Sequence, residues 1–210
     1  MIVSVFGASG RTGHAFVRIA AEAGLLQRLH YRNKPSDLIP DTATVVVGAL
    51  ADPTAVREVL RGADAVVIVL GPRPDARGVF CATATKAIIA GLRTQGVPRI
   101  LCVTGAMIGE MPRNVALAMK MFAFAQRKTE RVDMLDDRDE QERVVRNSKL
   151  SWTVIKPPRL TDDAATSFDA GPSVSVGLTS KLSRENLAAF LVREVQVPQY
   201  PTMPVYIKDR

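Results

Sequence analysis

The sequence predicts an α/β protein built on a doubly wound parallel sheet. Short apolar runs alternate with longer segments that carry apolar residues at helical spacing. The short runs are continuously apolar, which is typical of strands buried on both faces of a parallel sheet. With 210 residues, 47% hydrophobic and 23% charged, the chain has ordinary globular composition and is long enough to bury a core.

Six strands are expected from these runs, and several end at glycine or proline. The first leads directly into a glycine-rich turn, and the fourth is stopped by Gly71 and Pro72. Right-handed crossovers between successive strands then give the doubly wound order. The expected strands are Ile2–Phe6, Leu26–Tyr31, Thr44–Gly48, Ala65–Leu70, Arg99–Thr104 and Ser151–Lys156.

Helices are expected between the strands. Asp52 and Pro53 provide a cap and a first-turn proline for the second helix. Gly24 and Gly96 are natural stops for the first and third. The expected ranges are about 11–23, 52–62, 77–94, 112–130 and 136–147.

The pattern changes after Pro158. Residues 161–180 are polar, a helix is expected over 184–195 with Ser183 as its cap, and residues 203–208 could form an edge strand. We therefore expect a single domain over residues 1–210, with about 158–210 forming a small C-terminal lobe on the substrate side. The sequence does not indicate whether residues 161–180 act as a lid.

The charge is basic, with 28 Lys and Arg against 21 Asp and Glu and a formal net charge of +7. This balance favours anionic partners such as phosphates, although a basic surface without a specific partner gives the same number. The basic residues are scattered among acids, which argues against a nucleic-acid partner.

Cysteine and histidine are too sparse to indicate a metal site. Cys81 and Cys102 lie outside any CxxC motif and are expected to be reduced core thiols. No apolar stretch has the length of a membrane span, and the chain begins with a strand and not a signal peptide. We expect a cytoplasmic protein without a membrane partner, as a monomer or small homo-oligomer.

The turn after the first strand reads Gly7-Ala8-Ser9-Gly10-Arg11-Thr12-Gly13. Glycines permit a tight turn and let the backbone approach a pyrophosphate, while the following helix offers free N–H groups and a partial positive charge. Ser9 and Thr12 add hydroxyl donors. A glycine triplet alone is weak evidence, but a strand before it and a helix after it are the context that a Rossmann-type dinucleotide site requires.

The end of the second strand indicates which dinucleotide is bound. NAD-preferring proteins place an acidic residue there to bind the ribose 2′-hydroxyl, whereas this chain has Tyr31-Arg32-Asn33-Lys34. Arg32 can pair with a 2′-phosphate, and Lys34 and Arg11 add charge. The sequence therefore favours NADP(H) over NAD(H).

These segments together resemble a known family. The turn GASGRTG, the strand exit YRN, and the segments VVVGALADPTAVREVLRGADAVVIVLG and VVRNSKLSWTVIKPPRLTD are similar to the NAD(P)-binding, NmrA-like branch of the atypical short-chain dehydrogenases/reductases, closest to the flavin reductase or biliverdin-IXβ reductase type. The resemblance covers nearly the whole chain.

The resemblance implies roles for particular residues. The turn would hold the pyrophosphate, Arg32 would meet the 2′-phosphate, and Thr104 is the candidate catalytic residue near the reacting carbon. The other implied cofactor contacts are Leu70, Gly71, Arg73, Gly105, Ala106, Pro157, Pro158 and Arg159.

Two positions depart from the family pattern. Ala49 stands where relatives often carry an Asp that can reach the adenine, so that contact is in doubt. Gly105 follows Thr104 where a second hydroxyl residue is common, which leaves Thr104 as the better polar candidate.

The catalytic Tyr-x-x-x-Lys pair of most short-chain dehydrogenases is missing, because none of Tyr31, Tyr200 and Tyr206 precedes a lysine by four residues. This favours an NADPH-dependent reductase of a flavin, a quinone or a similar conjugated acceptor, which needs little acid–base help. The alternative is a non-catalytic NADP(H) sensor, and an epimerase or dehydratase acting on a nucleotide sugar is disfavoured.

Two further patterns have competing interpretations. The Met- and Phe-rich stretch 116–128 could form an adaptable apolar wall for a flat substrate, or could simply be helix core. Glu142 and Arg146, one helical turn apart, are expected to form a surface ion pair and not a catalytic one.

Overall fold

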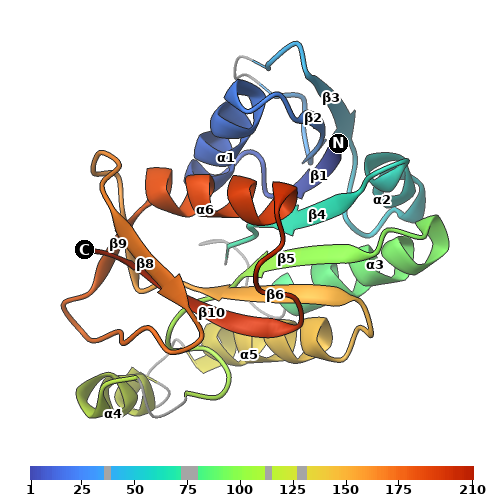
Figure 1. The fold of residues 1–210 in the computed structure, drawn as a ribbon. Helices are drawn as coiled ribbons and strands as arrows, with labels where there is room; N and C mark the ends of the chain where they lie inside the picture. Colours follow the sequence, from blue (N-terminus) through green and yellow to red (C-terminus); the bar gives the residue numbers. More distant parts are fainter. Residues whose placement is uncertain (36–38, 72–79, 112–114, 127–131) are drawn as a thin grey trace.

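The computed structural model describes residues 1–35, 39–71, 80–111, 115–126 and 132–210. Within these ranges a mostly parallel sheet is flanked by helices on both faces, which confirms the Rossmann-like α/β fold (Figure 1). The strand order is β3-β2-β1-β4-β5-β6-β10-β8, so the order reverses between β1 and β4. That reversal is the switch point at which open α/β sheets bind ligands.

The main sheet contains β1 (Ile2–Phe6), β2 (Leu26–Tyr31), β3 (Ala43–Val47), β4 (Ala65–Ile68), β5 (Arg99–Val103), β6 (Ser151–Lys156), β8 (Phe168–Gly171) and β10 (Met203–Asp209). Two short strands, β7 (Arg159–Thr161) and β9 (Lys181–Ser183), form a separate parallel pair. The six strands expected from the sequence are all present, with ends that differ by at most two residues.

The helices that cover the sheet lie in two layers. One layer contains α1 (Arg11–Glu22) and α6 (Arg184–Gln196), and the other contains α2 (Pro53–Leu60), α3 (Cys81–Gln95) and α5 (Val132–Arg146) (Figure 1). Each layer packs against one face of the sheet and buries an apolar core. The first core contains Phe16 and Phe190, and the second contains Ile88 and Trp152. Burial of both sheet faces explains why the central strands are continuously apolar.

Local signals place three helix ends as expected, whereas α5 begins at Val132 and not near residue 136. The Asp52 carboxylate accepts a hydrogen bond from the Thr54 N–H at 2.8 Å, and Pro53 occupies the first turn of α2. The Ser183 hydroxyl accepts one from the Asn186 N–H at 3.1 Å at the start of α6. Gly96 ends α3 with a left-handed φ of 67°, a conformation that glycine adopts without strain. The start expected for α3, near residue 77, lies outside the described residues.

The prediction of an edge strand at residues 203–208 was wrong. β10 lies inside the sheet, where it pairs in parallel with β6 and antiparallel with β8. The edge position belongs to β8, which is only four residues long and sits in the polar stretch 161–180. A strand this short, with the sequence FDAG, has no detectable period, so its pairing could not be read from the sequence.

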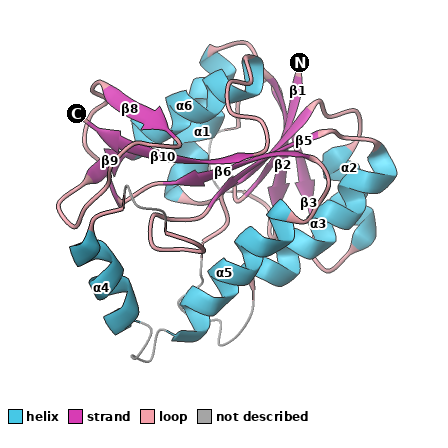
Figure 2. Ribbon diagram, turned by 60° about the horizontal axis from the view of Figure 1, so that its bottom comes forward, coloured by secondary structure: helices cyan, strands magenta, loops and turns pink. Residues whose placement is uncertain are grey.

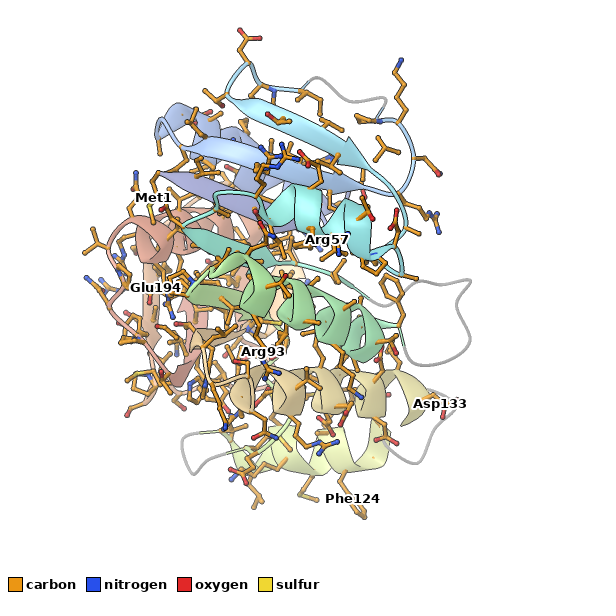
Figure 3. All side chains as sticks on the ribbon, turned by 90° about the vertical axis from the view of Figure 1, so that its right-hand side faces the viewer. Met1, Arg57, Arg93, Phe124, Asp133 and Glu194 are labelled. Atoms are coloured by element: carbon orange, nitrogen blue, oxygen red, sulfur yellow. The ribbon has the colours of Figure 1, made fainter. Side chains whose placement is uncertain are left out.

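The Met- and Phe-rich helix α4 (Leu117–Gln126) stands away from the sheet (Figure 2). Met119 and Ala123 are buried on its inner face, whereas Met121 and Phe124 are exposed, and Phe124 points outward (Figure 3). The core interpretation therefore applies to the inner face alone. Among the helices of the described ranges, none is long and apolar enough to cross a membrane.

Candidate functional site

The carboxyl ends of five neighbouring strands meet along one edge of the sheet. Because the strands are parallel and adjacent, Arg32 after β2, Gly7 after β1, Leu70 after β4, Thr104 after β5 and Lys156 at the end of β6 follow one another along this edge. Each step between strands is about 4.8 Å. Residues far apart in the sequence are thus aligned across the switch point.

A pocket of about 620 Å³ opens over the β2, β1 and β4 end of this edge. Six predicted site residues line it: Gly7, Ser9, Gly10, Arg32, Leu70 and Gly71. The remaining wall comes from His30, Ala49, Leu50, Ala51, Val69, Phe80, Thr83, Ala84 and Ala87. The other described members of the predicted set lie outside this lining, namely Arg11, Thr12, Gly13, Lys34, Thr104, Gly105, Ala106, Pro157, Pro158 and Arg159. Arg73 lies outside the described residues.

The physical reason for having glycine differs among the three glycine positions of the turn. Gly7 has φ 101°, and a Cβ there would lie 2.8 Å from the Val69 carbonyl oxygen. A Cβ at Gly13 would overlap the Gly7 carbonyl oxygen and lie 2.7 Å from the Ala8 Cα. The fold itself therefore requires glycine at positions 7 and 13.

Gly10 is different, because a Cβ there would meet, among the described atoms, the Gly7 carbonyl oxygen at 3.4 Å and nothing else within 4 Å. Gly10 precedes α1 as its N-cap, and its exposed backbone lines the pocket. Packing does not demand glycine here, so the free space above Gly10 fits the close approach of a ligand to the helix N-terminus.

Arg11 forms an ion pair with Asp162 at 2.9 Å, which joins the start of α1 to the residue after β7. Both side chains are mostly exposed, 72% and 61%, and Asp162 also pairs with Arg184 at 2.6 Å. An exposed pair of this kind contributes at most about 1 kcal/mol. Because this ion pair is weak, the Arg11 guanidinium can also interact with an anion bound at the turn to which it belongs.

His30 lines the pocket, although it was not among the predicted site residues. Its Nε2 lies 2.9 Å from the Gly48 carbonyl oxygen, and its ring stacks on Phe6 with centroids 5.5 Å apart. Burial lowers the pKa of His30, which favours a neutral ring. Strand alternation could have found it, since His30 and Arg32 share one face of β2 and its extension.

Ala49 also lies in the pocket wall. The position at which the family resemblance implies an aspartate therefore lies at the pocket, but in this chain it presents a methyl group. With Leu50, Phe80 and Ala87 it makes this part of the wall apolar.

Backbone contacts bring the ends of β5 and β6 together. The Thr104 N–H donates to the Ile155 carbonyl at 2.9 Å, and the Ala106 N–H donates to the Pro157 carbonyl at 2.8 Å. The buried Arg138 guanidinium donates to the carbonyls of Leu70, at 2.7 Å, and of Thr104, also at 2.7 Å. Arg138 thus fixes the exits of β4 and β5 relative to each other.

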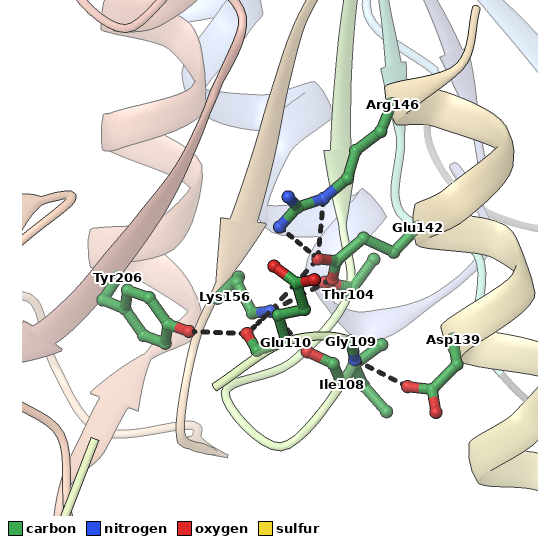
Figure 4. Close-up of polar contacts among 9 residues, drawn as sticks. All are labelled: Thr104, Ile108, Gly109, Glu110, Asp139, Glu142, Arg146, Lys156 and Tyr206. Atoms are coloured by element: carbon green, nitrogen blue, oxygen red, sulfur yellow. Dashed lines mark hydrogen bonds and ion pairs between the residues drawn. The ribbon is translucent and has the colours of Figure 1, made fainter. Parts of the chain in front are cut away.

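The prediction of a surface ion pair between Glu142 and Arg146 was half wrong. The two side chains do pair, at 2.6 Å, but the Glu142 side chain is only 2% exposed. Its carboxylate also accepts hydrogen bonds from Lys156 Nζ at 3.2 Å and from the Thr104 hydroxyl at 3.2 Å (Figure 4). Helical spacing gave the partner on α5, whereas the partners on β5 and β6 come from the tertiary structure.

Lys156 was not anticipated as a site residue, and its side chain is fully buried. Its ammonium group lies 5.5 Å from the centre of the Tyr206 ring, because Tyr206 on β10 is paired in register with Lys156 on β6. Burial raises the pKa of Tyr206 and lowers that of Lys156. This tyrosine and lysine therefore meet in space, but the phenol is made a weaker acid and not the stronger one that proton transfer requires.

Comparison with known proteins identifies the family and agrees with the fold. The sequence profile of a family described as NAD(P)H-binding matches residues 7–198. The chain belongs to this family. The match begins at the first glycine of the turn and extends through α6, so it includes the whole edge described above.

Solved structures share the fold over nearly the full length. A short-chain dehydrogenase/reductase from Veillonella parvula DSM 2008, in complex with NADP, superposes with a TM-score of 0.79 at 14% identity, over 98% of this chain and 93% of that one. An anaerobillin reductase from Escherichia coli O157:H7 gives 0.79 at 17%, over 99% and 96%. A candidate NADH-flavin reductase from Streptococcus pneumoniae TIGR4 gives 0.78 at 16%, over 100% of both chains. At these identities the similarity shows the fold.

Proposed function

We propose that this member of the NAD(P)H-binding family is an NADPH-dependent reductase that transfers hydride to a flavin, a quinone or a similar conjugated acceptor. The observation that carries the proposal is the pocket over the glycine turn, which has free space above Gly10 and Arg32 in its wall. A pyrophosphate fits the first feature and a 2′-phosphate fits the second.

The preference for NADP(H) depends on charge. Arg32 is exposed at the pocket rim, and the short segment Tyr31–Lys34 contains no acid that would repel a phosphate. A complex with NADP in the Veillonella parvula relative is consistent with this preference. Lys34 lies two residues further on and would contribute longer-range attraction.

Bound NADPH supplies a hydride, that is, one proton with two electrons, and is left as NADP⁺. The acceptor takes this hydride together with one proton from water and becomes its dihydro form. A conjugated acceptor suits the chain, because in the described residues the tyrosine nearest to the β5–β6 edge, Tyr206, is buried and its pKa is raised. The protein's part is to bind and orient both partners.

The test is to mix the protein with NADPH and a panel of acceptors, namely FMN, a soluble quinone and a linear tetrapyrrole, and to follow the nicotinamide absorbance. We expect oxidation of NADPH with at least one acceptor. The Arg57→Ala variant is the control, because Arg57 is an exposed base on α2 outside the pocket lining and should oxidise NADPH at the wild-type rate.

Tight NADPH binding without oxidation across the panel would contradict the reductase and favour a non-catalytic NADP(H) sensor. Absence of NADPH binding would contradict both functions.

A further inference from the structure

The carboxylate of Glu142 is the centre of a cluster that consists of the buried Thr104, Glu142 and Lys156 and the partly exposed Arg146. Glu142 and Lys156 are 2% and 0% exposed, and their charged groups are 3.2 Å apart. Such a pair costs desolvation free energy and is retained only where its hydrogen bonds are well satisfied. The cluster lies at the ends of β5 and β6, beside the segment that would face a nicotinamide ring.

Lys156 and Glu142 determine the shape of the loop 105–111 that follows β5. Lys156 Nζ donates to the carbonyls of Ile108 and, at 3.3 Å, of Glu110 (Figure 4). Gly109 has φ 63°, and a Cβ there would lie 2.5 Å from Glu142 Oε1, so the carboxylate fills the space that a side chain would need. The Gly109 N–H is held in turn by Asp139 Oδ1 at 2.6 Å. The loop therefore wraps around the ion pair.

The same carboxylate sets the orientation of the Thr104 hydroxyl. A hydroxyl has one hydrogen and two lone pairs, and a carboxylate can only accept. Thr104 Oγ1 must therefore donate its hydrogen to Glu142 Oε2, at 3.2 Å. Any further group that contacts Thr104 Oγ1 has to be a hydrogen-bond donor, such as a carboxamide N–H₂ or a ring N–H.

From these contacts we propose that Glu142 and Lys156 are positioning residues for hydride transfer, which hold the loop 105–111 in place and present Thr104 Oγ1 as a hydrogen-bond acceptor. The inference rests on the proposed reductase function. It also makes the role of Thr104 specific, because the residue then binds an N–H of the nicotinamide carboxamide or of the acceptor. Acceptors that carry such N–H groups and take their proton from water, as flavins and tetrapyrroles do, fit this arrangement best.

The experiment compares two buried ion pairs on the same sheet. Lys156→Met breaks the pair at the carboxyl end, whereas Arg99→Met breaks the Arg99–Glu194 pair, 7% and 1% exposed, at the amino end of β5. Both variants should lose thermal stability, so all measurements are made well below their unfolding temperatures. Amide hydrogen exchange of loop 105–111 is measured without cofactor, and the rate of hydride transfer and the NADPH Kd are measured with it.

We expect faster amide exchange of loop 105–111 in Lys156→Met, and hydride transfer slower by up to about 100-fold, as a misplaced reaction partner causes. The NADPH Kd should change by less than about threefold, because Lys156 lies outside the lining of the pocket in which we propose that the dinucleotide binds. Arg99→Met should match the wild type in loop exchange and transfer rate. Thr104→Val, which keeps the volume but removes the acceptor oxygen, should also slow transfer, and Thr104→Ser should restore it.

Wild-type loop exchange in Lys156→Met would overturn the inference, and so would full transfer activity in Thr104→Val. If the wild-type protein reduces none of the acceptors, the proposed function fails. The exchange measurement still decides whether Lys156 holds the loop, since it needs no cofactor and no substrate.

Discussion

The edge of the sheet at which the strands' carboxyl ends meet has two halves, which differ in packing and in charge. Over β2, β1 and β4 the wall consists mainly of glycines and apolar side chains around an open pocket, with the exposed Arg32 at the rim. Over β5 and β6 the groups are charged, closely packed and buried, with Glu142 and Lys156 at the centre. If the proposed sites are right, substitutions at Gly10 or Arg32 in the open half should change ligand binding with little effect on the fold, whereas substitutions in the packed half should change both.

The largest effect is expected in the packed half. Glu142→Ala should lower the free energy of unfolding by about 3–5 kcal/mol, because it leaves the Lys156 ammonium buried without its carboxylate. Glu140→Ala is the control on the same helix, since Glu140 pairs with the exposed Lys86 and Arg143. Its loss should be at most about 1 kcal/mol. Urea denaturation of both variants gives the comparison, and equal losses would refute the distinction between the halves.

In the open half, substitutions at two glycines of the turn should distinguish an effect on NADPH binding from an effect on the free energy of unfolding. Gly10→Val places a side chain in the space above the helix N-terminus and should weaken NADPH binding by about 100-fold or more, or about 2.7 kcal/mol. Its unfolding free energy should change by about 1 kcal/mol at most. Gly13→Ala should instead lower that free energy by about 1–3 kcal/mol, because its Cβ overlaps the Gly7 carbonyl.

Calorimetric binding and thermal unfolding of the two glycine variants distinguish these effects. Unchanged NADPH affinity in Gly10→Val would show that the pyrophosphate does not approach the turn.

The smallest expected effect concerns the distinction between the two dinucleotides. Arg32→Ala should weaken NADPH binding by about 10- to 100-fold, which corresponds to the loss of one charge-assisted hydrogen bond of about 1.5–3 kcal/mol. NADH binding should change by less than about threefold, because NADH has no 2′-phosphate. The two dissociation constants are measured for this variant and for Arg57→Ala, which should leave both unchanged. Equal losses for both dinucleotides would remove Arg32 from the 2′-phosphate site.

The local sequence was sufficient to predict much of the fold. The glycine turn, the six apolar strands and the caps at Asp52, Ser183 and Gly96 each depend on residues within a few positions of one another. The same holds for Arg32, which is placed at the pocket because it follows β2 directly. These features obey rules of period, capping and backbone conformation that act over one or two turns of chain.

Other features depend on contacts between residues far apart in the sequence, and only the tertiary structure reveals them. The position of β10 inside the sheet depends on β8, a strand too short to show a period. The burial of Glu142 depends on Lys156, which is 14 residues away, and on Thr104, which is 38 away. The sequence by itself predicted the glycine turn between β1 and α1, at which we propose that the phosphates of a dinucleotide bind. The tertiary structure decided how the other end of the site is held, because a charge is buried only when partners from several strands and helices meet around it.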